Sequence, residues 1–213
     1  MSGIVGSRFN TRGSGLIGSV GTDGQVFTSS GAGVSHTFED AAGGAHIKLS
    51  TATASTSATV TLTGMDSTYQ NYMIELDNIV NADDDVQLRF RFIQGGSTIT
   101  DSDYESHTQR FSIPTNMTFL NREYPVDYIH MSDGGDNAND PQLNGRMFIY
   151  NAPTADAHTS FVSNISHQHY DNHDHQMNLA HGELANNTAS TGIVFHFSSG
   201  NIDAGTFRLY GIS

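Results

Sequence analysis

Histidine is the residue type in this chain with the most potential for chemistry. The sequence has 11 histidines, and five of them lie between positions 167 and 181. Four form two His-x-His pairs, His167 with His169 and His173 with His175. On a strand, such a pair directs both imidazoles to one face, a geometry that suits Zn, Ni or Cu. The pattern therefore predicts a divalent metal site, to which several copies of the chain could contribute equivalent ligands.

Two other interpretations of this histidine-rich segment remain open. The segment can be a polar, partly exposed loop that holds no ligand. It can also be a pH switch, because imidazoles titrate at about pH 6.5 and neighbouring cationic rings repel one another. Protonation would then loosen an interface.

Two acidic segments carry the hard oxygen ligands that calcium prefers. One is the run of three aspartates at 83–85. The other contains Asp133, Asp136 and Asp140, with turn-forming glycines between the carboxylates. The second segment lacks the glutamate of an EF-hand loop. Solvated turns therefore compete with calcium binding as the explanation of both segments.

For catalysis the sequence offers little, and we expect no enzyme. The chain has no cysteine, which excludes thiolate nucleophiles, thiolate metal sites and disulfides. No Gly-x-Ser-x-Gly motif lies between a strand and a helix, and no phosphate-binding loop is present. Carboxylate pairs such as Asp103 and Glu105 occur in any acidic chain and do not by themselves indicate a glycosidase.

The elements that must position these side chains are strands. Charged residues make up only 15% of the chain, and lysine occurs once, at Lys48. β-Branched and aromatic residues are frequent, which favours an all-β fold. The clearest alternation runs over 86–92, where four apolar residues are separated by Gln87, Arg89 and Arg91. Only a strand puts the arginines on one face and the apolar side chains on the other.

Alternation or apolar runs predict several further strands, at 58–63, 72–76, 145–150, 159–165, 193–197 and 206–212. Their number and spacing predict a two-sheet antiparallel β-sandwich of jelly-roll type. The Ser/Thr/Ala-rich stretch at 50–57 can be an edge strand or a linker. The polar segments 97–110 and 133–143 are expected to be surface loops, where recognition usually takes place.

We expect the chain to divide near residue 45. Half of the glycines, 11 of 22, lie in the first 44 residues. Glycine at this density forgoes side-chain packing and raises the entropic cost of ordering the chain. Residues 1–45 are therefore predicted to form an extended attachment arm and residues 46–213 the sandwich. Within the arm, residues 20–28 resemble a hairpin that turns at Asp23-Gly24. The candidate contact residues of the arm are Arg8, Phe9, Arg12, Val26 and Phe27.

The charge of the chain limits its partners. The formal net charge is -13, from 9 basic and 22 acidic residues, which argues against nucleic acid as a partner. The first 21 residues carry two arginines and no acid, so they are +2 and the remainder is -15. A basic arm on an acidic body suggests docking onto an acidic neighbour. No apolar run approaches the roughly 20 residues that span a bilayer, so we expect no membrane insertion.

The order of short motifs along the chain resembles a known group of proteins. The motifs include Gly-Ile-Val-Gly-Ser-Arg at 3–8, Gly-Thr-Asp-Gly-Gln at 21–25 and Phe-Ser-Ser-Gly-Asn-Ile-Asp-Ala-Gly at 197–205. Further pieces lie at 12–15, 69–74, 86–90 and 95–98. The chain resembles the small β-sandwich tail-fibre-like or virion structural proteins of tailed phages, particularly phages of marine bacteria and cyanobacteria. It departs from that pattern in the histidine-rich segment.

The resemblance implies a non-enzymatic virion component that is often homotrimeric. We expect a fibre or tip module, attached to other virion proteins through its arm and displaying loops to a host glycan or protein. Tyrosines in loops could stack on sugars or belong to the core, namely Tyr104, Tyr124, Tyr128 and Tyr170. One alternative is a capsid decoration protein whose arm crosses capsid subunits, and another is a glycan-degrading tail enzyme. The start of the chain lacks a signal-peptide pattern, so we expect synthesis in the host cytoplasm and a final location on the virion.

Overall fold

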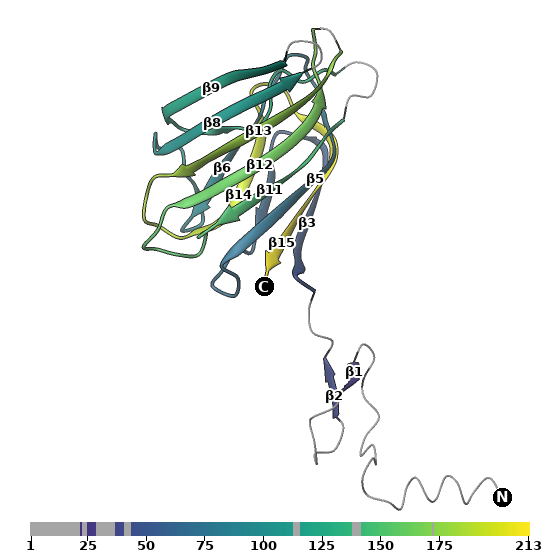
Figure 1. The fold of residues 1–213 in the computed structure, drawn as a ribbon, viewed down its shortest axis with the longest axis vertical. Coiled ribbons are helices and arrows are strands. Elements are labelled where there is room, and N and C mark those ends of the chain that lie inside the picture. The colour runs from purple at the N-terminus through teal and green to yellow at the C-terminus, as the bar shows by residue number, and fades with distance from the viewer. Residues whose placement is uncertain are drawn as a thin grey trace, which may run out of the picture. The chain divides into compact units, whose positions relative to one another are not determined.

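The structure, a computed structural model, divides the chain into two compact units, Met1–Gly44 and Ala45–Ser213 (Figure 1). It describes residues 22, 25–28, 37–40, 44–112, 116–137, 142–171 and 173–213. The side chains of residues 40 and 116–123 are outside this description. The described residues contain strands, turns and bends but no helix, so the predicted all-β class is confirmed. Accordingly, no helix in the described part is long and apolar enough to cross a membrane.

The second unit contains two antiparallel sheets. The larger sheet has eight strands, in the spatial order β3 (His46–Ser57), β15 (Ile202–Ile212), β5 (Asn71–Asn81), β11 (Leu143–Tyr150), β12 (Thr159–Gln168), β13 (His175–Leu184), β8 (Tyr104–Ser112) and β9 (Asn116–Val126). The smaller sheet has the order β10 (Ile129–His130), β6 (Leu88–Gln94), β14 (Ser190–Phe197) and β4 (Val60–Thr63), with β7 (Ser97–Thr98) paired to β6. Figure 1 shows the larger sheet in front of the smaller one.

Aromatic side chains join the two sheets into a β-sandwich-like unit. Phe90 of β6 meets Phe161 of β12 edge to face, with ring centroids 5.0 Å apart. Phe195 of β14 lies 4.9 Å from Phe207 of β15. All four rings are buried in one hydrophobic core. Burying each such side chain contributes roughly 1.5–3 kcal/mol, so this aromatic layer is a main source of the sandwich's stability.

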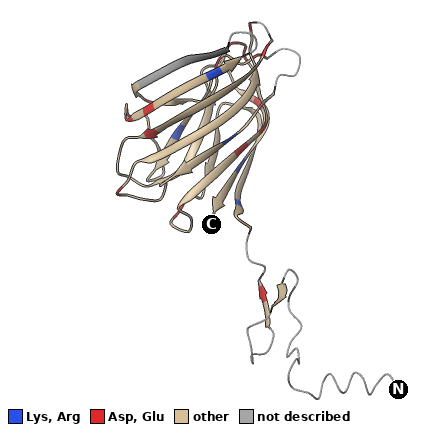
Figure 2. Cartoon of the chain, viewed as in Figure 1, with Lys and Arg blue, Asp and Glu red and all other residues tan. Residues whose placement is uncertain are grey.

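The alternation over 86–92 has the structural result that the sequence predicts. Phe90 and Phe92 are fully buried, whereas Arg89 and Arg91 lie partly exposed on the opposite face of β6. The ambiguous stretch at 50–57 is part of β3, the edge strand of the larger sheet. Figure 2 shows that the few basic residues of the sandwich lie on its strands, whereas most acidic residues lie in loops and near strand ends.

The expectation of surface loops at 97–110 and 133–143 is wrong in part. Residues 104–112 form β8, and Tyr104 is fully buried. The sequence pattern does not indicate this strand, because the inward positions Ser106 and Thr108 are polar and interrupt the apolar alternation. In the second segment, Asp136 is only 1% exposed. Gly135 forms isolated antiparallel β-bridges with Val86 and with His169.

The described residues of the first unit form a separate two-stranded sheet. β1 (Gln25–Thr28) pairs antiparallel with β2 (Thr37–Asp40), and the rings of Phe27 and Phe38 lie 5.3 Å apart. The Gln25 N–H donates to the Thr22 carbonyl at 3.2 Å, and the described partner of β1 is β2. Asp23, Gly24 and the first residues of the predicted hairpin at 20–28 lie outside the described residues, so that hairpin stays a prediction. Val26 and Phe27 are each 46% exposed. The other predicted arm residues, Arg8, Phe9 and Arg12, lie outside the described residues, and the attachment role of the arm stays a prediction.

Candidate functional site

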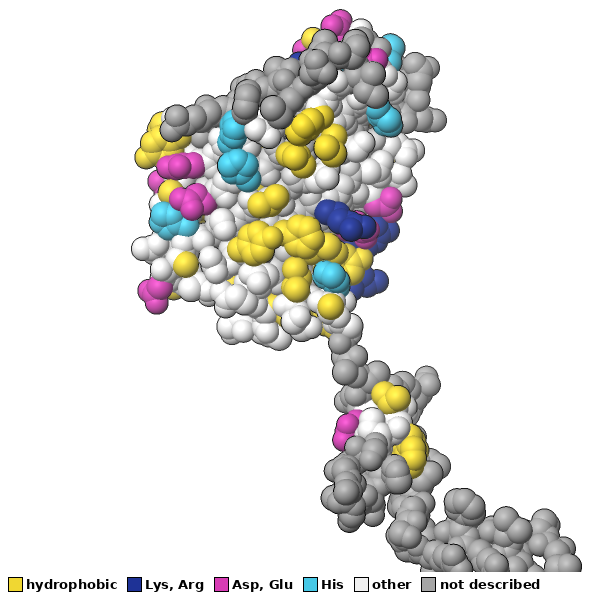
Figure 3. Space-filling model, viewed as in Figure 1, with side chains coloured by type: hydrophobic (Ala, Val, Ile, Leu, Met, Phe, Trp, Pro, Cys, Tyr) yellow, Lys and Arg dark blue, Asp and Glu magenta, His cyan; other side chains and the backbone are white. Residues whose placement is uncertain are grey.

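An open groove of about 890 Å³ lies on the outer face of the larger sheet. It crosses five neighbouring strands, from β11 through β12, β13 and β8 to β9. Figure 3 views this sheet face and shows hydrophobic, histidine and acidic side chains gathered on it. The groove is therefore a mixed apolar and polar surface built on regular strands rather than on loops.

Strand register places one row of side chains across the groove. Tyr150 of β11 lies opposite Ser160 of β12, which lies opposite Glu183 of β13, which lies opposite Glu105 of β8. At Glu105 the pairing with β9 is irregular, because Tyr104 pairs with Val126 and Ser106 pairs with Glu123. Two residues of β9 therefore stand opposite the single residue Glu105, and such a bulge redirects side chains.

One of these two β9 residues is Tyr124, which also lines the groove. The row thus has a tyrosine at each end, Tyr150 on β11 and Tyr124 on β9. Glu183 and Glu105 lie between them. Because neighbouring strands are about 4.8 Å apart, the row extends roughly 19 Å across the sheet.

A second, parallel row carries imidazoles. Val162 of β12 lies opposite His181 of β13, which lies opposite His107 of β8. The two imidazole rings meet edge to face, with centroids 5.4 Å apart. Beyond His107, the register partner on β9 is Arg122, whose side chain is outside the described part.

The groove holds an unusual share of the exposed apolar surface. Six large hydrophobic side chains are strongly exposed in the described part of the chain, and three line the groove. These three are Tyr124 at 64%, Val162 at 47% and Tyr150 at 37% exposed. Single exposed hydrophobic residues need no explanation, but a group of them in a hollow is typical of a binding surface.

Two polar side chains of the groove, Glu183 and Glu105, only accept hydrogen bonds when they are ionised. Glu183 Oε1 lies 2.9 Å from Nδ1 of His158, next to the groove. Glu105 has no hydrogen-bond or ion-pair partner among the described side chains. Ionised carboxylates accept hydrogen bonds from hydroxyl or ammonium donors, and tyrosine rings cover the apolar faces of a ligand. This combination suits a ligand that carries many hydroxyl groups and also has apolar faces.

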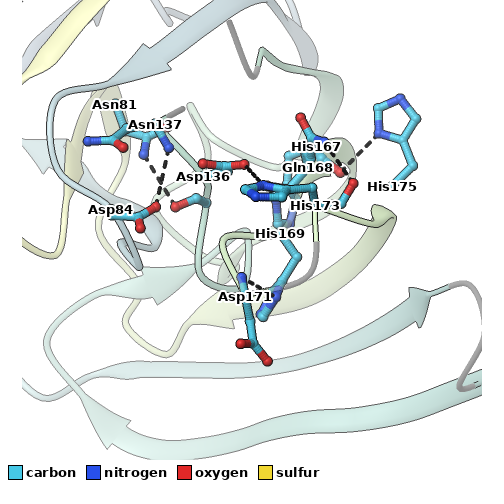
Figure 4. A network of polar contacts seen from close by, with 11 residues as sticks. Asn81, Asp84, Asp136, Asn137, His167, Gln168, His169, Asp171, His173 and His175 are labelled. Carbon is cyan, nitrogen blue, oxygen red and sulfur yellow. Dashed lines mark hydrogen bonds and ion pairs between the residues drawn. The ribbon is translucent and has the colours of Figure 1, made fainter. Parts of the chain in front are cut away.

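Of the five histidines between 167 and 181, only His181 lines the groove, and the four predicted metal ligands are divided (Figure 4). His167 is 2% exposed on the inner face of β12, where its Nε2 accepts a hydrogen bond from Asn178 Nδ2 at 2.6 Å. Its Nδ1 donates to the Gln168 carbonyl at 3.0 Å. Burial lowers the pKa of His167. His175 is exposed at the start of β13.

The other two histidines contact the acidic segment. His169 Nε2 lies 3.6 Å from Asp133 Oδ2, and Figure 4 shows His173 directed at Asp136, which its Nδ1 contacts. Asp133 also forms an ion pair with Arg110. These contacts tie the acidic segment to the connection between β12 and β13.

The predicted metal ligands are thus not gathered into one site in the described part of the chain. No group of three or more His, Asp or Glu side chains in that part is placed to hold a metal ion. Asp133 and Asp136 are engaged by cationic or imidazole partners, and Asp140 lies outside the described residues. Metal and calcium binding therefore stay predictions.

Of the four tyrosines considered for sugar stacking, only Tyr124 lines the groove. Tyr104 is in the core, Tyr128 covers the Arg89 guanidinium at 4.1 Å, and Tyr170 packs on His169. Sequence reasoning missed Tyr150 because it sits at the end of a strand. The sequence also did not indicate that four residues of β8 and β13 line one groove, namely Glu105, His107, His181 and Glu183. The alternation in each strand indicates which residues face outward, but only the strand order shows that they are neighbours.

Comparisons with protein-family models, with curated proteins and with solved structures found no match for this chain.

Proposed function

We propose that this chain is a non-enzymatic glycan-binding module of a tailed-phage particle. The observation that supports glycan binding is the row of groove side chains, in which Tyr150 and Tyr124 flank Glu183 and Glu105. The phage setting is supported by the motifs at the two ends of the sequence.

The groove matches the chemistry of a sugar chain. A pyranose ring has an apolar C–H face, which an exposed tyrosine ring can cover, and hydroxyl groups at its edge, which carboxylates can bind. The two tyrosines lie near opposite ends of a row roughly 19 Å long. An oligosaccharide of several units can therefore contact both tyrosines at once, with its hydroxyl groups above Glu183 and Glu105.

The binding test uses purified protein on a panel of oligosaccharides, followed by calorimetry with the best binder. Tyr124→Ala and Tyr150→Ala should each weaken binding about 10-fold, because the ring area buried by a sugar contributes on the order of 1–2 kcal/mol. Leu49→Ala is the matched control, because Leu49 is exposed on β3 and does not line the groove. Equal affinity of all variants, or no binding across the panel, would refute the glycan-binding role.

One observation favours an enzyme as the second candidate. Glu105 and Glu183 are directly opposite each other on adjacent strands. Opposite residues have Cβ atoms about 4.5–5.5 Å apart, and retaining glycosidases hold their two carboxyl groups about 5–5.5 Å apart. Incubation of the bound glycan with the protein, followed by chromatography of the products, tests this alternative. If the protein cleaves the glycan, and both Glu105→Gln and Glu183→Gln abolish the cleavage, the protein is a glycan hydrolase and not a binding module.

On the particle, we propose a fibre or tip module held by the N-terminal arm, with the sandwich arranged as a jelly roll and associated as a homotrimer. The exposed Val26 and Phe27 of β1 support a contact role for the arm.

The alternative to a fibre or tip module is a capsid decoration protein. Immunogold labelling or cryo-electron microscopy separates them, because a few copies at the tail fit a fibre and hundreds on the head fit decoration. Sedimentation tests the trimer, and elemental analysis tests the two proposed metal sites.

A further inference from the structure

We infer that the groove is selective for glycans that carry free amino groups, with one protonated amine held between Glu105 and Glu183. This inference rests on the proposed glycan-binding function and names the ligand class of the same groove. Its basis is the pair of carboxylates at the centre of the groove, for which the described side chains provide no lysine or arginine partner.

The two carboxylates face each other because of strand pairing. Glu105 of β8 and Glu183 of β13 are register partners, and both lie on the outer face and line the groove. Like charges directly opposite each other on adjacent strands are unfavourable. A cationic ligand between them removes this repulsion when it binds. The gain in binding free energy is therefore larger than at a single isolated carboxylate.

No described basic side chain neutralises this pair. Glu105 has no ion-pair partner among the described residues, and Glu183 contacts only the imidazole of His158. Three described arginines are paired elsewhere, Arg91 with Asp127, Arg110 with Asp133, and Arg208 with Glu75 and Asp77. Since no lysine or arginine of the described side chains pairs with either carboxylate, a ligand can supply the cation.

The flanking tyrosines favour the same ligand class. Ammonium groups are attracted to the faces of aromatic rings, and Tyr150 and Tyr124 stand at the two ends of the row. Neutral sugars still gain the contacts with the rings but not the charge pairing. Acidic sugars meet two carboxylates on a chain of net charge -13.

The titratable groups around the pair set the pH range of the experiment. His158 contacts Glu183, and His107 and His181 occupy the neighbouring row, beyond which lies Arg122. Protonation of these imidazoles in acid would oppose an incoming cation. We therefore place the measurement at about pH 7, above the ordinary titration midpoint of imidazole, where glutamates are ionised.

The experiment compares four oligosaccharides of equal length by calorimetry with the full chain in low salt. They are a glucosamine oligomer, its N-acetylated form, a glucose oligomer and a galacturonate oligomer. We expect the glucosamine oligomer to bind at least 10-fold more tightly than the other three and to lose affinity with added salt. Glu105→Gln and Glu183→Gln should each reduce this preference, the ratio of the affinities for the amino and N-acetylated oligomers, about 10-fold.

Asp203→Asn is the matched control, because it makes the same charge change at an exposed position of β15 outside the groove. Circular dichroism and thermal melts confirm that the glutamine variants are folded, which is expected because the change removes a like-charge contact. Equal affinity for the amino and N-acetylated oligomers, or glutamine variants that keep the preference, would overturn the amino-sugar inference but leave glycan binding intact. If none of the four oligomers binds but other sugars of the panel do, only the amino-sugar inference is overturned. Failure of the whole panel would overturn both.

Discussion

Gly182 of β13 approaches Glu105 of β8 so closely that a Cβ on Gly182 would lie 2.0 Å from the Glu105 carbonyl oxygen. Real Cβ atoms essentially never come this near to a backbone atom. A side chain at position 182 would therefore force β13 and β8 apart. The same two strands carry the carboxylate pair and the imidazole pair of the groove, so this contact sets the spacing of both pairs.

We predict that Gly182→Ala destabilises the protein by about 1–3 kcal/mol, because the added methyl group must displace the backbone of β8. It should also weaken glycan binding, since both pairs in the groove are moved apart. Urea denaturation and calorimetry measure the two effects. A variant with unchanged stability and unchanged binding would contradict this role for Gly182.

Acid should destabilise the sandwich through three histidines with lowered pKa values. Burial, with further contributions from Arg89 and His196, lowers the pKa of His130 to about 4. Burial likewise lowers the pKa of His167 and, together with Arg91 and Arg89, that of His196. In the unfolded chain histidine titrates at about pH 6.5. The folded state therefore binds fewer protons below that pH.

The stability contributed by these neutral histidines is present above pH 6.5 and is lost as the pH falls toward their folded-state pKa values. Each unit of lowered pKa corresponds to about 1.4 kcal/mol lost once the pH is below the folded-state value. Thermal melts between about pH 7 and pH 4.5 should show a falling midpoint. His130→Asn should flatten this dependence, whereas His175→Asn, at an exposed position, should not. A midpoint that stays constant over this range would show that the buried histidines do not control acid stability.

Tyr104→Phe should destabilise the core although it removes only one oxygen atom. The Tyr104 hydroxyl accepts a hydrogen bond from the Phe92 backbone N–H at 2.9 Å and donates one to the Ile99 carbonyl at 3.1 Å. The change leaves the buried Phe92 N–H unpaired, which costs about 1–3 kcal/mol. Urea denaturation measures the loss. Tyr150→Phe is the control, because the Tyr150 side chain is exposed, and equal losses for both variants would contradict the prediction.

Glu105→Gln should raise the stability of the ligand-free protein. It removes the like-charge contact with Glu183, which costs on the order of 0.5 kcal/mol. The thermal midpoint should rise at low salt, and the difference should shrink as salt screens the pair. A fall in the midpoint would mean that the two carboxylates do not repel each other in the folded state.

The amino-acid sequence alone determined the all-β class and the faces of the regular strands. Side chains alternate between the two faces of a strand, so the pattern at 86–92 is enough to place Phe90 in the core and Arg89 outside. The same reasoning failed for β8, where Ser106 and Thr108 occupy inward positions and hide the alternation. The metal-binding role of the histidine pairs stays a prediction, and spacing along the chain does not reveal that His167 is buried while His175 is exposed.

The candidate site was decided only by the tertiary structure. Glu105 and Glu183 are far apart in the sequence and become neighbours because β13 pairs with β8. Tyr124 joins them because β9 bulges opposite Glu105, and Tyr150 because β11 and β12 continue the same row. Alternation within a strand is a local property of the backbone. The order and register of strands depend on long-range hydrogen bonds and core packing, which no single segment encodes.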